Sequence, residues 1–325
     1  MPELLPHEPG SPGWLAARRA GVTATDIVTI VGLSAWDSVY SLFWRKLGQV
    51  PDEPERDRWE LGKALEPYAA KRWLEGRCTS WLTEGGLYRN TSRAWQMATP
   101  DALVDYDGIS VMGVFESKSW ADADRRRWED GPPAVVRAQV LWQMDVMDVA
   151  AGHVGVVFLP SGEFRSYTIE HDCSVHGSYC HEAGKEDLCP DCDLCTDLAL
   201  MRAAGEEFMA RLRLELPPPD PDSSAATLAA VRARFARVPD KQADVDPELW
   251  AKYQANALMI DAHAGLKREY EIALREQAGE AQVLCVGGQP VARRIVGDSA
   301  VKAHTRHVDY LRRITPKGDD DAADA

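Results

Sequence analysis

The sequence predicts an α/β fold in which a mixed central sheet is flanked by helices. Apolar residues recur with helical spacing over the first 75 residues, and patterns typical of strands then come in two pairs. A helical pattern near 133–148 separates these pairs, which lie near 95–105 and 110–118 and near 153–159 and 163–169. This order favours one sheet with helices on its faces, built from roughly the first 170 residues.

The N-terminal helices are expected near 11–20, 24–31, 38–47 and 57–75. Arg18 and Arg19 stand ahead of the second of these helices. Thr23, Thr25 and Asp26 offer hydroxyl and carboxylate caps for its start. A helix N-terminus attracts phosphate, and a neighbouring guanidinium can bind phosphate through two hydrogen bonds. The same residues are also explained by an ordinary cap and a solvated arginine.

The strands near 95–105 and 110–118 are joined by Asp107-Gly108, a strong hairpin signal. We expect this hairpin to bring Asp101 opposite Glu116 to within about two residues. Side chains at positions i and i+2 share a face of a strand, so Glu116 and Lys118 lie together. Two carboxylates suit Mg²⁺ or Mn²⁺, and a lysine beside the metal can act on the attacking water or offset transition-state charge. The same spacing also arises by chance in many proteins.

Motifs on both flanks of this hairpin resemble a known family. They are Trp14 to Ile27 (WLAARRAGVTATDI), Gly62 to Pro67 (GKALEP) and Ala138 to Met144 (AQVLWQM), beside Ala98 to Asp101 (ATPD) and Val114 to Lys118 (VFESK). In order and spacing they are similar to the lambda exonuclease and YqaJ-type viral recombinase family of PD-(D/E)XK nucleases. The resemblance covers roughly residues 10–170, about half of the chain. It implies the restriction-endonuclease-like core of that superfamily.

The resemblance also implies roles for individual residues. In the family, the acids that match Asp101 and Glu116 hold metal ions, and the lysine that matches Lys118 acts on the water. The glutamate that matches Glu66 adds an acid to the metal site, and the glutamine that matches Gln139 lies on a helix beside it. Taken without the family, Glu66 is equally explained as an exposed residue of an amphipathic helix.

Two further positions match the family's binding site for a terminal 5′-phosphate, namely Arg18 and Thr25. Members typically have serine where Thr25 stands, so the hydroxyl is kept. Many members also have a second glutamine where this chain has Leu141, and Gln143 lies one helical turn from Gln139.

The function implied by the resemblance is a Mg²⁺-dependent (or Mn²⁺-dependent) exonuclease that digests double-stranded DNA from 5′ ends in phage recombination. Its partners would be DNA ends and a single-strand annealing or recombinase protein, and the family forms ring trimers around DNA. One alternative is an endonuclease or RecB-like repair nuclease with an iron–sulfur cluster, because one metal site serves several reactions. Another is a non-catalytic, zinc-containing DNA-binding protein.

A cysteine- and histidine-rich segment spans residues 171–196. In a reducing compartment such crowding indicates metal binding, and the best set is Cys173 with His176 and Cys189 with Cys192. Four such ligands describe a structural zinc site. Three alternates can replace a member of this set: Cys180, His181 and Cys195. An iron–sulfur cluster or a loop without metal remains open at this point.

Changes in the sequence pattern divide the chain into segments. We expect a nuclease core over 1–170, the Cys/His-rich insertion over 171–196, a helix closing the core over 197–216, an extension over 217–315 and an acidic disordered tail over 316–325. The extension follows Pro217-Pro218-Pro219 and contains helices near 225–237 and 247–278 and a β-hairpin near 282–296. The helical stretch near 247–278 is long enough for a helical hairpin or a coiled-coil arm. Two isolated cysteines, Cys78 and Cys285, are expected to be buried as small hydrophobes.

Composition limits the class of protein. The chain has 325 residues, of which 45% are hydrophobic and 27% charged, and its formal net charge is −14. A charge of this sign argues against broad adhesion to nucleic acid, although local arginine clusters and bound metal still allow DNA as a substrate. No apolar run is long enough to cross a membrane and no signal peptide pattern is present, so we expect a cytoplasmic protein that does not bind membranes.

Overall fold

The computed structural model forms two compact units, with residues 1–35 and 52–217 in the first and 36–51 and 218–325 in the second. None of the helices it describes has both the length and the apolar character needed to cross a membrane. Its described residues are 2–52, 57–77, 81–105, 111–170, 193–235, 238–257, 264–301 and 304–313.

The first unit is built on a five-stranded sheet with the order β2-β5-β6-β7-β8. Strands β6 and β7 are parallel, and the other neighbours are antiparallel, so the predicted mixed sheet is confirmed. The predicted turn at Asp107-Gly108 lies outside the described residues. The strands are β2 (Trp81–Glu84), β5 (Ala102–Asp105), β6 (Val111–Ala121), β7 (Ala151–Leu159) and β8 (Phe164–Glu170).

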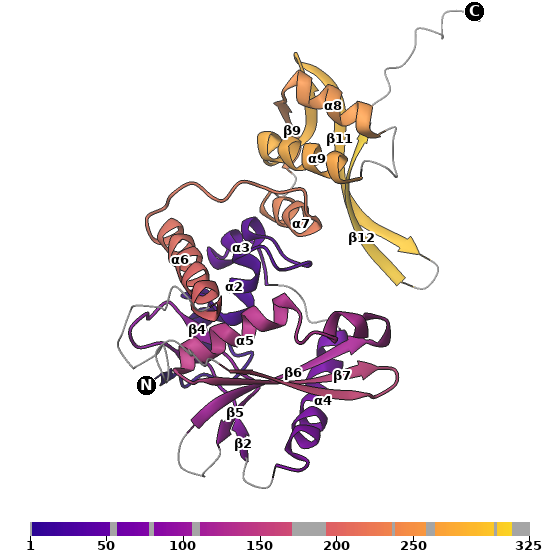
Figure 1. The fold of residues 1–325 in the computed structure, drawn as a ribbon. Coiled ribbons are helices and arrows are strands. Elements are labelled where there is room, and N and C mark those ends of the chain that lie inside the picture. Colours follow the sequence, from indigo (N-terminus) through magenta and orange to yellow (C-terminus); the bar gives the residue numbers. More distant parts are fainter. Residues whose placement is uncertain are drawn as a thin grey trace, which may run out of the picture. The chain divides into compact units, whose positions relative to one another are not determined.

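Helices cover both faces of this sheet (Figure 1). Trp73 of α4 packs against Phe115 of β6, whereas the next residue of β6, Glu116, bonds to side chains of α5. Because successive residues of a strand face opposite ways, α4 and α5 lie on opposite faces. The helices of this unit are α1 (Pro12–Arg19), α2 (Ala24–Ile30), α4 (Asp57–Leu74), α5 (Ala134–Met147) and α6 (Asp193–Arg213), with the 3₁₀ helix η1 (Asp122–Trp128).

Helix α5 approaches the sheet closely at Gly152 of β7. A Cβ atom at this glycine would lie 2.2 Å from Cγ1 of Val140. Val140 is fully buried, so α5 is fixed against β7 at this point. A small second sheet of the same unit, with the order β1-β3-β4, consists of β1 (Glu3–Leu4), β3 (Tyr88–Arg89) and β4 (Met97–Ala98).

The second unit contains a four-stranded sheet with the order β12-β11-β10-β9. The predicted C-terminal hairpin is present as β10 and β11, and the sequence patterns did not indicate its neighbours β9 and β12. Of the two arrangements expected near 247–278, a helical hairpin or a coiled-coil arm, the structure has two helices that pack together through Trp250 and Leu274. The elements are β9 (Val238–Asp244), β10 (Ala281–Val286), β11 (Gln289–Val301), β12 (His304–Arg313), α7 (Ala225–Arg234), α8 (Pro247–Ala257) and α9 (Ala264–Ala278).

Helix α3 (Val39–Lys46) belongs to the second unit, although we expected residues 36–51 within the first 170-residue core. Tyr40 and Val50 are buried in one apolar cluster with Val231 of α7 and Ile272 of α9. The burial of this apolar surface favours the grouping of α3 with the second unit. It depends on residues that are far away in the sequence, in α7 and α9.

Candidate active site

The two expected acids lie side by side on neighbouring strands. The β5–β6 ladder ends where Ala102 pairs with Phe115, which leaves Asp101 at the position opposite Glu116. The backbone N–H of Ser117 donates to Oδ2 of Asp101 over 2.7 Å, and Glu116 is only 3% exposed. The antiparallel pairing therefore brings both carboxylates to one end of the β5–β6 pair.

The Glu116 carboxylate accepts hydrogen bonds from three side chains. Lys118 Nζ lies 2.5 Å and Gln139 Nε2 2.6 Å from Oε1, and Gln143 Nε2 lies 2.7 Å from Oε2. Gln139 and Gln143 are four residues apart on α5 and so share a face of the helix. The helix thus holds the orientation of this carboxylate from one side of the sheet.

The electrostatics of the cluster are those of acids held close together. Burial, and after it the charge of Glu116, raise the pKa of Asp101 well above its usual range. Burial lowers the pKa of Lys118, but the carboxylates of Glu116 and Asp101 outweigh burial and the net shift is upward. Each of two neighbouring acids disfavours the ionised form of the other. A cation that binds between them stabilises both ionised forms.

Glu66 lies near this pair but does not complete a three-acid set. Burial and the charge of Glu116 raise the pKa of Glu66, which places it within electrostatic range from α4. In the described part of the chain, no three His, Cys, Asp or Glu side chains form a group that could hold a metal ion. Of the three expected ligands, Asp101, Glu116 and Glu66, the structure therefore brings together only Asp101 and Glu116.

The donor atoms nevertheless fit a hard divalent cation. Within the described residues, Oε1 of Glu116 accepts two donors and Oε2 accepts one, so Oε2 retains a lone pair. Beside it, Oε1 of the fully buried Gln143 has no hydrogen-bond partner in the described structure. A buried carbonyl oxygen is stabilised by a donor such as water, and Mg²⁺ usually keeps several waters.

The residues expected at a DNA end lie on and before α2. Arg18 Nη1 donates to Oγ1 of Thr99 over 3.3 Å, and the guanidinium lies 4.3 Å from the ring centre of Trp14. Thr99 is two residues before Asp101, so the arginine lies beside the segment that carries this acid. Thr25 is exposed in the first turn of α2.

The predicted cap of α2 is confirmed, and Thr23 provides it. Its hydroxyl accepts from the Asp26 backbone, and the Asp26 carboxylate accepts from the Thr23 backbone over 2.8 Å. Because Thr23 is used in this capping box and is 2% exposed, the hydroxyl available to solvent at this helix start is that of Thr25.

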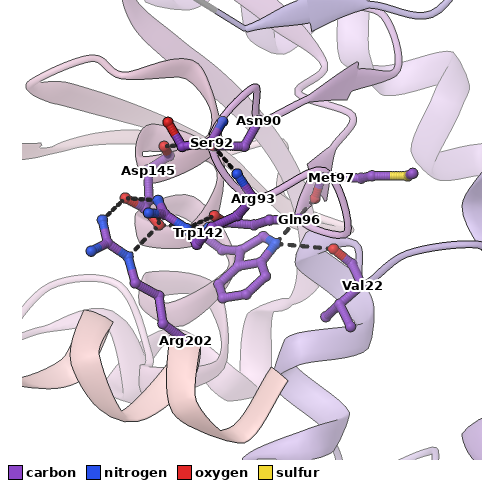
Figure 2. Close-up of polar contacts among 9 residues, drawn as sticks. All are labelled: Val22, Asn90, Ser92, Arg93, Gln96, Met97, Trp142, Asp145 and Arg202. Atoms are coloured by element: carbon purple, nitrogen blue, oxygen red, sulfur yellow. Dashed lines mark hydrogen bonds and ion pairs between the residues drawn. The ribbon is translucent and has the colours of Figure 1, made fainter. Parts of the chain in front are cut away.

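The sequence patterns did not indicate Trp142, which connects three parts of the site (Figure 2). Its indole N–H donates to the carbonyl of Met97 over 3.0 Å and to that of Val22 over 3.3 Å. Met97 leads into the segment that ends at Asp101, and Val22 leads into α2. One buried side chain of α5 therefore joins both segments to the helix that supports Glu116.

A buried ionic network, also missed from sequence, lies one turn further along α5 (Figure 2). Asp145 accepts from Arg202 of α6, from Arg93 over 3.2 Å and from Gln96 over 2.5 Å. Burial alone raises the pKa of Asp145, but bonds and charge from Arg202 and Arg93 outweigh it and lower the pKa. The network attaches α6 to the core through the ion pair of Arg202 with Asp145. Burial strengthens the attraction between these two charges.

The expected Cys/His ligands fall almost entirely outside the described residues. These are Cys173, His176, Cys189 and Cys192, with the alternates Cys180 and His181, so the zinc site stays a prediction. The remaining alternate, Cys195, is fully buried in the first turn of α6. Cys285 is buried in β10 as expected, and Cys78 lies outside the described residues.

The fold and this cluster define an α/β protein with an acidic site on two neighbouring strands. Residues 13–152 match the family model of the YqaJ-like viral recombinase domain, so this segment of the chain is similar to such a domain. Every residue expected at the acidic site and at the DNA end lies within it. The sequence resemblance to this family is thereby confirmed.

Individual proteins that match this chain do so at low sequence identity. The uncharacterized protein YqaJ of Bacillus subtilis (strain 168) is 25% identical over 118 residues, or 36% of each chain, so the match spans about a third of that protein. The alkaline exonuclease LHK-Exo of Laribacter hongkongensis, also solved with dAMP, is 20% identical over 63% of this chain and 94% of its own, with a TM-score of 0.46. A phage-related exonuclease of Haemophilus somnus 129PT is 13% identical over 61% and 96%, with a TM-score of 0.41.

Proposed function

We propose that the protein is a metal-dependent exodeoxyribonuclease that digests linear double-stranded DNA. The observation that supports it most is the pairing of Asp101 with Glu116 on adjacent strands, with Lys118 on the same face as Glu116. The pair lies inside the segment that matches a viral recombinase domain. Acids and a lysine in this arrangement suit metal-assisted hydrolysis of a phosphodiester.

In this proposal Asp101 and Glu116 hold Mg²⁺ or Mn²⁺, with Glu66 as a further acid. A bound divalent ion would polarise the phosphate and lower the pKa of a coordinated water. Gln139 and Gln143 keep the Glu116 carboxylate in one orientation through their hydrogen bonds. Lys118, held beside that carboxylate, donates to the attacking water or to a phosphate oxygen as negative charge develops.

We further propose that Arg18 and Thr25 bind the terminal 5′-phosphate. An arginine suits this role because its planar fork can donate two hydrogen bonds to one phosphate. Its contact with Thr99 keeps it near the segment that carries Asp101, so a bound end would lie close to the acids. Digestion would then proceed in the 5′-to-3′ direction and leave 3′ single strands.

The same family relationship extends the proposal to partners. Single-stranded 3′ product is the substrate of an annealing or recombinase protein, which is therefore the expected partner in phage recombination. A ring trimer around DNA would supply processivity. A structural zinc ion in the Cys/His segment completes the proposed cofactors.

The test uses linear duplexes labelled at one end of one strand, with and without a 5′-phosphate, and a covalently closed circle, each with Mg²⁺. We expect loss of the 5′-ended strand, stimulation by the phosphate and an intact circle. Lys118→Ala should abolish this loss, whereas Lys71→Ala, an exposed lysine of α4, should not.

Each part of the proposal can fail separately. Cutting of the circle would replace the exonuclease with an endonuclease. Loss of the 3′-ended strand first would contradict the direction. Equal rates on the duplexes with and without a 5′-phosphate would contradict the role of Arg18. No cutting under any of these conditions would refute the nuclease function.

A further inference from the structure

The backbone of Asp101 lies against a glycine that follows strand β2. The ladder between β2 and β5 ends at the pair of Glu84 with Ala102, and the next residues in this register are Gly85 and Asp101. The backbone N–H of Gly85 donates to the carbonyl oxygen of Asp101 over 3.3 Å. The Asp101 carboxylate accepts from the backbone N–H of Ser117 over 2.7 Å. Asp101 is therefore held from two sides, by the end of β2 and by β6.

The approach at Gly85 is too close for a side chain. A Cβ atom at this position would lie 1.8 Å from the carbonyl oxygen of Pro100 and 3.1 Å from the carbonyl carbon of Asp101. Because Cβ atoms essentially never come within 3.0 Å of another heavy atom, the contact with Pro100 would have to lengthen from 1.8 Å to at least 3.0 Å. The obstructing oxygen belongs to the backbone of a buried residue, so it cannot rotate away as a side chain can.

Backbone conformation does not explain the glycine at position 85. Its φ angle lies outside the left-handed region, so alanine can adopt the same backbone conformation. A glycine there also costs stability, because it gives the unfolded chain more conformational freedom than alanine does. Glycine in an extended segment often marks a place where another backbone comes close. The close approach to Pro100 and Asp101 is the feature that accounts for Gly85.

We propose that Gly85 is a positioning residue of the metal site and acts through Asp101. The inference rests on the proposed nuclease function in taking Asp101 and Glu116 as metal ligands. Without a Cβ atom, the end of β2 comes near enough to hold the Asp101 carbonyl, while Ser117 holds the carboxylate. Functional groups must be held within about 0.5 Å of their working geometry. A side chain at position 85 would displace Asp101 relative to Glu116 by more than this tolerance.

The neighbouring glycine provides a matched control. A Cβ atom at Gly86 would lie 2.7 Å from Cδ1 of Leu4, which is the tip of a side chain that is 56% exposed and can turn away. The φ angle of Gly86 also lies outside the left-handed region. Gly85→Ala and Gly86→Ala therefore add the same methyl group at adjacent positions. They differ in whether that group meets fixed backbone or a movable side chain.

The first measurement is the binding of Mn²⁺ to the full-length protein without DNA, from the loss of the electron paramagnetic resonance signal of free Mn²⁺. We expect Gly85→Ala to bind Mn²⁺ about 10- to 100-fold more weakly than wild type, as is typical when a group that orients a ligand is changed. Gly86→Ala should bind as wild type does. Urea unfolding establishes that both variants are folded. Wild-type Mn²⁺ affinity in folded Gly85→Ala, or an equal loss in Gly86→Ala, would overturn the inference.

A double-mutant cycle separates positioning from general damage to the fold. Asp101→Asn lowers Mn²⁺ affinity and leaves the affinity that the remaining acids provide. If Gly85 acts through Asp101, adding Gly85→Ala to Asp101→Asn should cause no further loss. An equal loss in both backgrounds would show that position 85 affects the site as a whole, and it would overturn the positioning role.

Amide exchange in the wild-type protein decides the matter if Gly85→Ala does not fold. Mg²⁺ bound by Asp101 should slow exchange of the Gly85 N–H, by up to about 100-fold at a Mg²⁺ concentration 100 times its dissociation constant. The reference is the N–H of Gly279, which donates to the carbonyl of Arg275 in the second unit. Equal effects of saturating Mg²⁺ on Gly85 and Gly279 would overturn the inference.

Failure of the inference and failure of the nuclease function give different results. If wild type binds Mn²⁺ and Gly85→Ala weakens this binding, but duplex DNA stays intact with Mg²⁺, the inference stands and the nuclease function fails. If wild type and folded Gly85→Ala digest DNA and bind Mn²⁺ equally well, the nuclease function stands and the inference fails.

Discussion

Gln143 offers the sharpest test of how the acidic site is supported. Its side chain is fully buried, donates to Oε2 of Glu116 over 2.7 Å and leaves its own Oε1 without a described partner. Gln143→Met keeps the length of the side chain and removes both polar groups. A hydrogen bond to a charged group contributes about 1.5–3 kcal/mol, and removal of an unpartnered buried carbonyl oxygen recovers about 1–3 kcal/mol.

These opposing contributions nearly cancel in the free energy of unfolding, so we expect a change within about 1 kcal/mol. The orientation of Glu116, in contrast, loses one of three donors. Groups that orient metal ligands typically change metal affinity or activity by about 10- to 100-fold. The variant should therefore need about 10- to 100-fold more Mg²⁺ for half-maximal digestion, or be slower by that factor.

The assay combines urea unfolding with the rate of duplex digestion over a range of Mg²⁺ concentrations. Gln254→Met, on α8 of the second unit, serves as the control and should leave the Mg²⁺ requirement unchanged. A Gln143→Met variant that folds with wild-type stability and shows the wild-type Mg²⁺ requirement would refute the idea that α5 positions Glu116.

Three further predictions concern stability. Asp145→Asn removes the buried charge that Arg202 and Arg93 share and should cost about 3–5 kcal/mol in urea unfolding, against under about 1 kcal/mol for the exposed Glu207→Gln; equal losses would contradict the network. Trp142→Phe removes the donor to two backbone carbonyls and should cost about 1–2 kcal/mol, measured in the same way; no loss would contradict the bridging role. Burial and the charge of Arg77 lower the pKa of His153 to about 4, so its stabilising contribution is complete above pH 6.5 and is lost as pH falls toward 4, by up to about 3 kcal/mol; this loss should be absent in His153→Asn, and identical pH profiles would contradict it.

Local chemistry made much of the first unit predictable. The capping box at Thr23 and Asp26, the strands around Asp101 and Glu116, and the helix over 134–147 follow from residue types that act within a few positions of one another. The shared face of Glu116 and Lys118 follows from the two-residue period of a strand. These features depend on short-range geometry, which a single sequence carries.

Features that depend on long-range packing were not predictable. Asp145 meets Arg202 from 57 residues away, and Tyr40 meets Glu276 from 236 residues away. No local pattern links such partners, so the ionic network on α5 and the membership of residues 36–51 in the second unit emerged only from the fold. The sequence relates Gln143 only to Gln139, one helical turn away, because the contact of Gln143 with Glu116 depends on how α5 crosses β6.

We propose that Glu116 and its neighbours bind a divalent metal ion with which the protein hydrolyses DNA. The most direct measurement is the release of nucleotides from a linear duplex by wild-type protein, Glu116→Gln and Glu170→Gln, each with Mg²⁺ and with EDTA. We predict release by wild type and by the exposed-site control Glu170→Gln with Mg²⁺, none in EDTA and none by Glu116→Gln. Release by Glu116→Gln at the wild-type rate, or undiminished release in EDTA, would contradict it.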